Sequence, residues 1–280
     1  MDDKLQIQPG TAQETLIIPL YARKKCGDKF PELYKDPAAA KICDRLDYDF
    51  SELDKKYDTA LYEFGALEGA MRQLDMMYEI NDYLNSHPNA SIVCLGCGLD
   101  LDPRRCGNQQ NRIFNVDFPD VIAMREELAG TDQRETNIVS DLTNLSWMDQ
   151  VDAHNGAVFY AAGVFHYLKK EDVKAIVLKM TELFPGCRLV FDTVGTLGYK
   201  LMMKAILKKH GMNDFGNLFY TNNAVKDLSS WSDKISVSSK GYMLGYYDMK
   251  LPSIKGIHRL LANIGDNIMH MQIVKIELLY

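Results

Sequence analysis

The spacing of apolar positions divides the chain into two parts. Between residues 11 and 85, apolar and charged positions alternate with helical spacing, most plainly from Leu61 to Leu84, and no convincing strand run interrupts them. After Ser86-His-Pro-Asn the pattern changes to short apolar runs separated by amphipathic segments. The sequence therefore predicts an N-terminal helical cap over residues 1–85 and a second domain over residues 86–280.

The second domain alternates strand-like and helix-like segments. Short apolar runs predict buried strands at residues 91–96, 112–117, 157–161 and 188–192. Residues 118–128 and 171–183 have the spacing of amphipathic helices. This alternation is typical of a parallel sheet with helices on both faces, so we expect an α/β fold of the Rossmann-like type.

The C-terminal third departs from simple alternation. Residues 196–232 have helical character but are rich in Met, Lys and Asn, and we expect a helical lid insertion over the carboxyl edge of the sheet. We expect this segment to set specificity, so exchanging it with that of a relative should change the range of molecules on which the protein acts. Two further strands are predicted at 242–247 and 271–280, around a helix at 254–264.

Composition narrows the class of protein. With 280 residues, 46% hydrophobic, the chain can bury a large core by itself. A net charge of -6 without a long basic block disfavours nucleic acid as a partner. The first residues lack the apolar core of a secretory signal, and no window approaches ~18 apolar residues. We therefore expect a cytoplasmic protein without a membrane partner, whose six cysteines are reduced thiols.

A glycine turn is the sharpest local motif. Val93-Cys-Leu-Gly-Cys-Gly98 runs from a predicted strand into a turn, and we expect a helix after it. Position 101 is Leu101 where a dinucleotide fingerprint has a third glycine, which disfavours an NAD-dependent oxidoreductase. S-adenosylmethionine, a nucleoside with a small zwitterionic tail, suits the shorter turn. A tight turn without a ligand is the alternative reading.

Two aspartates follow at positions suited to a nucleoside. Asp117 ends the next predicted strand, about 20 residues after the glycines, where a carboxylate can accept hydrogen bonds from both ribose hydroxyls. Because Pro119 and Asp120 are typical of a first helical turn, a helix N-cap is the alternative. Asp141 could face the adenine amino group, or form only an Asx turn.

Together the motifs resemble a known family. They are Thr15-Leu-Ile-Ile-Pro-Leu-Tyr-Ala-Arg23, Asp36-Pro37-x-Ala39, Ala70-Met-Arg72-x-x-Asp75, Leu95-Gly-Cys-Gly-Leu-Asp100, Val116-Asp-Phe-Pro-Asp-Val121 and Gly163-Val-x-x-Tyr167-Leu168. The chain resembles the leucine carboxyl methyltransferase family along most of its length, within a bacterial branch of polyketide O-methyltransferases. The resemblance implies a class I methyltransferase that uses S-adenosyl-L-methionine to methylate a hydroxyl or carboxyl group of a small molecule.

The resemblance also gives Arg72 a role, because the matching arginine of the family reaches the carboxylate of the cofactor. The alternative is an i,i+3 pair with Asp75 on a solvated helix face. Gly65 and Gly69 thin one face of the same helix and favour the binding role. The expected cofactor-binding residues are Arg72, Gly96, Cys97, Gly98, Asp117, Phe118, Asp141 and Leu142.

One departure from the family pattern bears on catalysis. The segment that commonly reads Glu-Gly-Val-Leu-x-Tyr-Leu is here Ala162-Gly-Val-Phe-His-Tyr-Leu168, so the usual glutamate is missing. A non-catalytic protein that binds S-adenosylmethionine or S-adenosylhomocysteine is therefore the alternative function. His166 could supply polarity near the transfer site instead, although a lone histidine is more often structural.

The acceptor pocket is the least determined part of the site. Its candidate residues, placed near the carboxyl edge of the sheet, are Tyr21, His166, Asp192 and Tyr199. Each could equally serve packing or capping, so no catalytic residue is assigned. Cys94, Cys97 and Cys106 lack a fourth ligand at a suitable spacing, and we expect no metal site. The sequence leaves the acceptor and the oligomeric state open.

Overall fold

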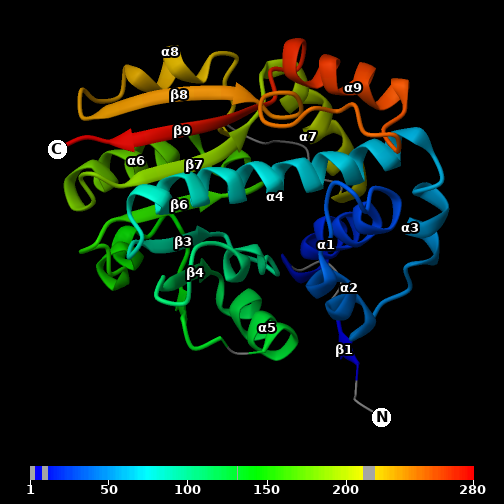
Figure 1. The fold of residues 1–280 in the computed structure, drawn as a ribbon, viewed down its shortest axis with the longest axis horizontal. Helices are drawn as coiled ribbons and strands as arrows, with labels where there is room; N and C mark the ends of the chain where they lie inside the picture. Colours follow the sequence, from blue (N-terminus) through cyan, green and yellow to red (C-terminus); the bar gives the residue numbers. More distant parts are fainter. Residues whose placement is uncertain (1–3, 8–11, 131, 211–217) are drawn as a thin grey trace.

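The computed structural model describes residues 4–7, 12–130, 132–210 and 218–280, and Figure 1 shows how their elements are arranged. The α-helices are α1 (Ala12–Lys29), α2 (Pro37–Asp44), α3 (Ser51–Lys56), α4 (Ala60–Ser86), α5 (Pro119–Ala129), α6 (Lys170–Leu183), α7 (Thr196–His210), α8 (Ala224–Ser229) and α9 (Gly256–Asn267). Short 3-10 helices are η1 (Asp102–Arg105), η2 (Leu145–Gln150) and η3 (Phe165–Tyr167).

A seven-stranded sheet forms the centre of the described residues. Its strands are β3 (Ser91–Leu95), β4 (Ile113–Asp117), β5 (Glu135–Val139), β6 (Ala157–Ala161), β7 (Arg188–Thr193), β8 (Ile235–Gly241) and β9 (Gln272–Leu278). Their order is β5-β4-β3-β6-β7-β9-β8, in which β9 runs antiparallel to both of its neighbours and the other pairs are parallel. The expected Rossmann-like α/β fold is confirmed.

The sheet separates two buried cores. Helices α4 and α5 cover one face, and α6 and α8 cover the other. The central strands are mostly apolar because both of their faces are buried; every residue of β3, β4 and β6 is buried, including the polar Ser91, Asn115 and Asp117. The order reverses between β3 and β6, the place where open α/β sheets bind ligands.

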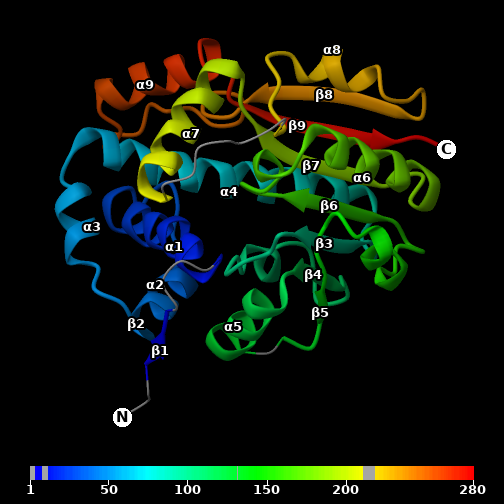
Figure 2. The ribbon, with the colours of Figure 1, turned by 180° about the vertical axis from the view of Figure 1, so that it is seen from behind.

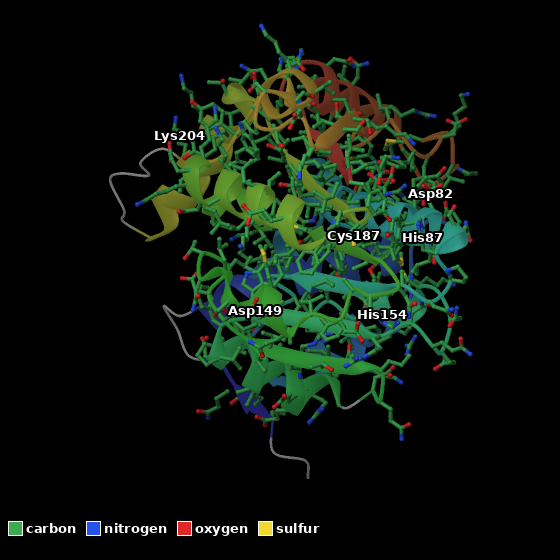
Figure 3. All side chains as sticks on the ribbon, turned by 90° about the vertical axis from the view of Figure 1, so that its left-hand side faces the viewer. Asp82, His87, Asp149, His154, Cys187 and Lys204 are labelled. Carbon is green, nitrogen blue, oxygen red and sulfur yellow. The ribbon has the colours of Figure 1, made fainter. Side chains whose placement is uncertain are left out.

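Helices α1, α2 and α3 gather at the carboxyl edge of the sheet, and α4 runs from there across the sheet (Figures 1 and 2). Helix α1 packs along α4, while α4 extends over β6 and β7. A short parallel pair, β1 (Leu5–Gln6) with β2 (Leu46–Asp47), adds strand structure that the helical pattern did not predict. Figure 3 looks onto the opposite edge, where His87, His154 and Cys187 immediately precede β3, β6 and β7.

The strand prediction at 242–247 is wrong. These residues form turns, and the strand β8 precedes them. The apolar residues of this segment are needed elsewhere: Tyr242 and Met243 pack into the core below α4 and α9. Strand β8, Ile-Ser-Val-Ser-Ser-Lys-Gly, is an edge strand that buries only alternate residues, which makes its sequence more polar than that of a central strand.

The helix expected after the glycine turn is also wrong. Only the four-residue η1 follows, and the chain then turns again at Gly107, whose φ is +60°. Helical structure in the predicted lid is confined to α7 and α8, and residues 218–221 are extended beside the end of η3. Residues 211–217 of the predicted lid lie outside the described residues. No described helix is long and apolar enough to cross a membrane.

Candidate functional site

A cavity of about 530 Å³ opens where the sheet order reverses. Its floor is the carboxyl ends of the parallel strands, and α1 and α4 close it from above. All eight residues expected to bind the cofactor line this cavity: Arg72, Gly96, Cys97, Gly98, Asp117, Phe118, Asp141 and Leu142. The structure thus brings together residues spread over 70 positions of the sequence, although their contact with a ligand stays a prediction.

The glycine turn presents bare backbone to the cavity. Gly96 and Gly98 have φ of +66° and +46°, a region that other residues rarely adopt. A Cβ on Gly96 would lie 2.7 Å from Cγ2 of Val164. Any residue larger than glycine would therefore clash with Val164 at this position. The turn is held in place by Asp117, whose Oδ2 accepts a hydrogen bond from the Gly98 amide at 2.8 Å.

Asp117 is not the N-cap of α5. Its Oδ1 accepts from the adjacent Phe118 amide at 2.8 Å, and Phe118 occupies the cap position without a side-chain cap bond. Each carboxylate oxygen keeps a second lone pair that can accept from a ligand hydroxyl. Burial raises the pKa of this carboxyl, so its charge is partly desolvated at the cavity wall.

Arg72 extends from α4 onto the backbone of the loop after β6. A Cβ on Gly163 would lie 2.5 Å from the Arg72 Nη1 atom, so the guanidinium needs a glycine beneath it. Nη1 is 3.6 Å from Oδ2 of Asp192. Among the described residues, the buried Nε atom has no hydrogen-bond partner. The Arg72 side chain lines the cavity and remains 18% exposed, so its guanidinium can meet a ligand anion there.

The alternative pair between Arg72 and Asp75 is not formed. The Asp75 side chain is fully buried, and both of its carboxyl oxygens lack a hydrogen-bond partner among the described residues. Of the two glycines on α4, Gly69 faces Ala22 of α1, whereas Gly65 has open space where a Cβ would stand. A Cβ on Gly69 would lie 3.8 Å from the Ala22 Cβ, an ordinary contact, so neither position requires glycine for close packing of the helix.

Two charged groups near Arg72 were not assigned a role from the sequence. Arg23 of α1 lines the same cavity, and its Nε donates to Oδ2 of Asp36 at 2.9 Å. Arg23 and Asp36 both belong to the motifs that carry the family resemblance, so the sequence already marked these two residues. Glu68 lies one turn before Arg72; burial, together with the Asp192 carboxylate, raises its pKa to about 7 despite the nearby guanidinium.

The β5 side of the cavity is formed by Asp141 and Leu142. Asp141 accepts hydrogen bonds from the Thr143 amide at 2.8 Å and from the Thr143 hydroxyl at 2.9 Å, so the Asx turn is present. Its side chain also borders the cavity, which makes the turn compatible with ligand contact. Phe118 is 46% exposed and forms an apolar wall between Asp117 and this turn.

The four acceptor candidates lie outside the cavity lining. Tyr21 is inside the cap, where its hydroxyl donates to Asp54 at 2.5 Å and its ring stacks on Phe50. Asp192 accepts from the Gly163 amide at 2.6 Å and faces Arg72, so it positions the lining.

The other two candidates lie beside the cavity. His166 is half-buried, and burial lowers its pKa to about 4. Tyr199 of α7 stacks on Tyr220 with ring centroids 4.6 Å apart.

The sequence model of the leucine carboxyl methyltransferase family matches residues 21–181, more than half of the chain. The chain belongs to the leucine carboxyl methyltransferase family. The match confirms the resemblance drawn from the motifs. All of these motifs lie inside the matched region except residues 15–20 of the first one.

Two relatives of the chain are methyltransferases by name, and a solved structure shares its fold. The chain is 29% identical over 182 residues to the tetracenomycin polyketide synthesis O-methyltransferase TcmP of Streptomyces glaucescens, which is 65% of each chain. It is 24% identical over 216 residues to the S-adenosyl-L-methionine-dependent methyltransferase dpfgK of Gibberella zeae, covering 71% of this chain and 72% of the relative. A DUF574 family protein of Streptomyces avermitilis has a similar fold, with a TM-score of 0.59 at 12% identity, covering 94% of this chain and 96% of that one.

Metal and thiol chemistry find no support in the described part of the chain. No group of three or more metal-ligating side chains occurs there. All six cysteines are free and buried. Burial raises the pKa of Cys94 and of Cys97 above the usual range, so these thiols beside the cavity are protonated and unreactive at neutral pH.

Proposed function

We propose that the protein is an S-adenosylmethionine-dependent methyltransferase that methylates an oxygen of a small molecule, either a hydroxyl or a carboxyl group. One observation carries the proposal: the order of groups along the cavity. Following the sheet from β5 to β6, the lining presents Asp141 and Leu142, then Asp117, then the glycine turn, then Arg72. Adenine, ribose and the charged amino-acid tail follow each other in the same order in the cofactor.

The residues present fit the cofactor. Arg72 offers a planar, permanently charged donor to the tail carboxylate, and Arg23 adds a second cation on the same side of the cavity. Asp117 can accept from both ribose hydroxyls because its two oxygens each retain a lone pair. The apolar side chains of Phe118 and Leu142 would enclose the adenine.

The contribution of the protein to transfer is mainly positional. When bound, the cofactor supplies a methyl group activated by a sulfonium; the sulfur–methyl bond breaks as the bond to the acceptor oxygen forms. Arg72 and Asp117 would fix the two ends of the donor, which leaves the acceptor to be held in line at about 3 to 3.5 Å. A carboxylate acceptor is already ionised, whereas a hydroxyl must also lose its proton.

The alternative function is a non-catalytic protein that binds the same cofactor. It is favoured by Ala162, which lines the cavity where the family pattern has glutamate. Methyl transfer does not require a dedicated base, so this substitution alone does not abolish the reaction. Turnover separates the two functions.

The first experiment is isothermal titration with S-adenosylmethionine, S-adenosylhomocysteine and NAD. We expect the first two ligands to bind and NAD not to bind. Asp117→Asn should weaken both by at least tenfold, because an amide oxygen cannot accept from two hydroxyls while holding the turn. The control is Asp120→Asn, an exposed aspartate three residues later that does not line the cavity.

Two outcomes would oppose the proposal. A folded protein that binds neither S-adenosylmethionine nor S-adenosylhomocysteine would overturn it. If both bind, transfer of labelled methyl to a panel of phenols and carboxylic acids decides between the functions; no transfer to any member, with binding intact, would favour the non-catalytic alternative.

A further inference from the structure

A buried carboxylate lies directly after the glycine turn. Asp100 follows Gly98 by two residues, lines the cavity and is 8% exposed. Two other carboxylates line the same cavity, Asp117 at the end of β4 and Asp141 after β5. The proposed function assigns those two to ribose and adenine. Asp100 has no partner in that assignment.

Asp100 lies on the side of the cavity where the cap carries its two arginines. The carbonyl of the preceding residue, Leu99, accepts a hydrogen bond from Nη2 of Arg23 at 2.9 Å. The next carboxylate along the chain, Asp102, accepts from Nε2 of Gln73 on α4 at 3.2 Å. The segment that carries Asp100 is thus in contact with α1 and α4, the two helices that bring cations into the cavity.

Within the described part of the chain, the side-chain oxygens of Asp100 accept hydrogen bonds from neutral donors only. Oδ2 accepts from the Tyr160 hydroxyl at 3.0 Å, and Oδ1 accepts from the Asp102 amide at 2.9 Å. Arg23 attracts the carboxylate through space but donates its hydrogen bonds to Asp36 and to a backbone carbonyl. Each Asp100 oxygen retains a lone pair, and a carboxylate buried this deeply is stabilised by a cation that donates to it.

We propose that Asp100 binds the ammonium group of the cofactor's amino-acid tail, and that this contact makes the site specific for a zwitterionic tail. The inference rests on the proposed function, since it adds a residue to the same cavity. The tail carries a carboxylate and an ammonium group on one carbon, so its site must offer a cation and an anion side by side. Arg72 and Arg23 supply the cations, and Asp100 is the carboxylate that lines the cavity on their side.

Two other carboxyl groups near Arg72 are less suited to this contact. Asp192 lies outside the cavity lining; one of its oxygens accepts from the Gly163 amide at 2.6 Å, and the other already faces the guanidinium. Glu68 also lies outside the lining, and its pKa, raised by burial to about 7, leaves the carboxyl partly protonated at neutral pH. Asp100 is therefore the better partner for an ammonium group.

The test compares three ligands by isothermal titration: S-adenosylhomocysteine, an analogue whose tail lacks the amino group, and an analogue whose tail lacks the carboxyl group. We expect the unaltered protein to bind the deaminated analogue at least about tenfold more weakly than S-adenosylhomocysteine. This measurement needs no variant.

Asp100→Asn then removes the charge that faces the amine but keeps the shape of the side chain. The Tyr160 hydroxyl can accept from the new amide where it now donates, so the local packing is retained. Kd should rise about tenfold or more for S-adenosylhomocysteine and for the decarboxylated analogue, which both carry the amine. Kd for the deaminated analogue should stay within about twofold.

Asp102→Asn is the matched control. Asp102 is also buried, at 4% exposure, and accepts from Tyr34 and Gln73, but it does not line the cavity. Any loss of affinity in this variant should be the same for all three ligands, because altered packing of the cap acts on the cavity as a whole. The comparison separates contact with the amine from a purely structural role.

Equal affinity of the unaltered protein for S-adenosylhomocysteine and for the deaminated analogue would overturn the inference. An equal loss for these two ligands in Asp100→Asn, or no loss for either, would also overturn it and would show that Asp100 does not hold the amine. Failure of all three ligands to bind the folded, unaltered protein would instead overturn the proposed function.

Discussion

Arg72 and Asp192 form an ion pair across the candidate site, with Nη1 3.6 Å from Oδ2. The two residues come from different layers, α4 and the end of β7, and the Gly163 amide donates to the other oxygen of Asp192 at 2.6 Å. Asp192 thus links the arginine to the loop after β6. The pair fixes where a ligand carboxylate can meet the guanidinium.

The first prediction concerns this link. Asp192→Asn keeps the side-chain shape and an acceptor for Gly163 but removes the charge that faces Arg72. We expect Kd for S-adenosylmethionine to rise roughly tenfold because the guanidinium is less well positioned. Isothermal titration measures the change, with Asp248→Asn, an exposed aspartate that pairs with Lys250, as the control. An unchanged Kd would show that Arg72 is oriented without Asp192.

A second prediction uses the glycine beneath Arg72. In Gly163→Ala the new Cβ would lie 2.5 Å from Nη1, so the guanidinium must move and cofactor binding should be weakened by more than tenfold. Gly130→Ala is a control for the backbone strain alone: Gly130 also has a positive φ, of +65°, but its Cβ would stand in open space. Both variants should lose stability, by about 1 to 3 kcal/mol, because a Cβ disfavours positive φ.

The outcome of that comparison is read from two measurements, chemical denaturation and titration with S-adenosylhomocysteine. Weaker binding only in Gly163→Ala, with both variants still folded, would confirm the role of the close contact. Equal binding by the two variants would mean that Arg72 does not contact the ligand from its observed position.

A third prediction concerns the buried carboxyl of Asp75. Burial, with the carboxylates of Asp266 and Glu79 nearby, raises its pKa to about 9. The unfolded chain loses this proton above its ordinary value of 3.8, whereas the folded protein keeps it, so the free energy of unfolding falls as the pH rises between these values. Asp75→Asn, neutral at every pH, should gain stability relative to the unaltered protein between pH 5 and pH 8.

Urea denaturation at several pH values checks this, with the exposed Asp120→Asn as the control. Only the Asp75 variant should show a stability difference that grows with pH. A difference that is constant with pH would indicate that Asp75 is ionised in the folded protein.

The sequence predicted the central strands well because their environment is uniform. Strands β3, β4 and β6 are buried on both faces, so each consists mainly of apolar residues. Edge strands break that rule. In β5 only Ile138 is buried, and in β8 only Ile235, so both strands are mostly polar and neither was predicted.

The residues of the candidate site also differ in how far the sequence could predict them. Gly96, Gly98 and Asp117 belong to one strand–turn–strand unit, so their local spacing was informative. Arg23 and the contact between Arg72 and Gly163 depend on how α1 and α4 pack on the sheet, which the spacing of residues does not encode.

The last prediction concerns His166, the residue next to the missing glutamate. Burial lowers the pKa of its imidazole to about 4, although Asp192 acts in the opposite direction. We therefore expect His166 to be neutral throughout the range from pH 5.5 to pH 8, where it can donate or accept a hydrogen bond but carries no charge. Nuclear magnetic resonance of the protein with labelled histidines measures this directly, and His166→Gln identifies the signal.

Stability gives an independent measurement of the same shift. Below about pH 6.5 the unfolded chain protonates this histidine and the folded protein does not, so the unaltered protein should lose stability relative to His166→Gln as the pH falls toward 4. A signal that titrates near pH 6.5 would contradict the prediction. It would also make His166 a candidate for a proton-transferring group, because an imidazole that titrates near neutral pH can exchange a proton with a substrate.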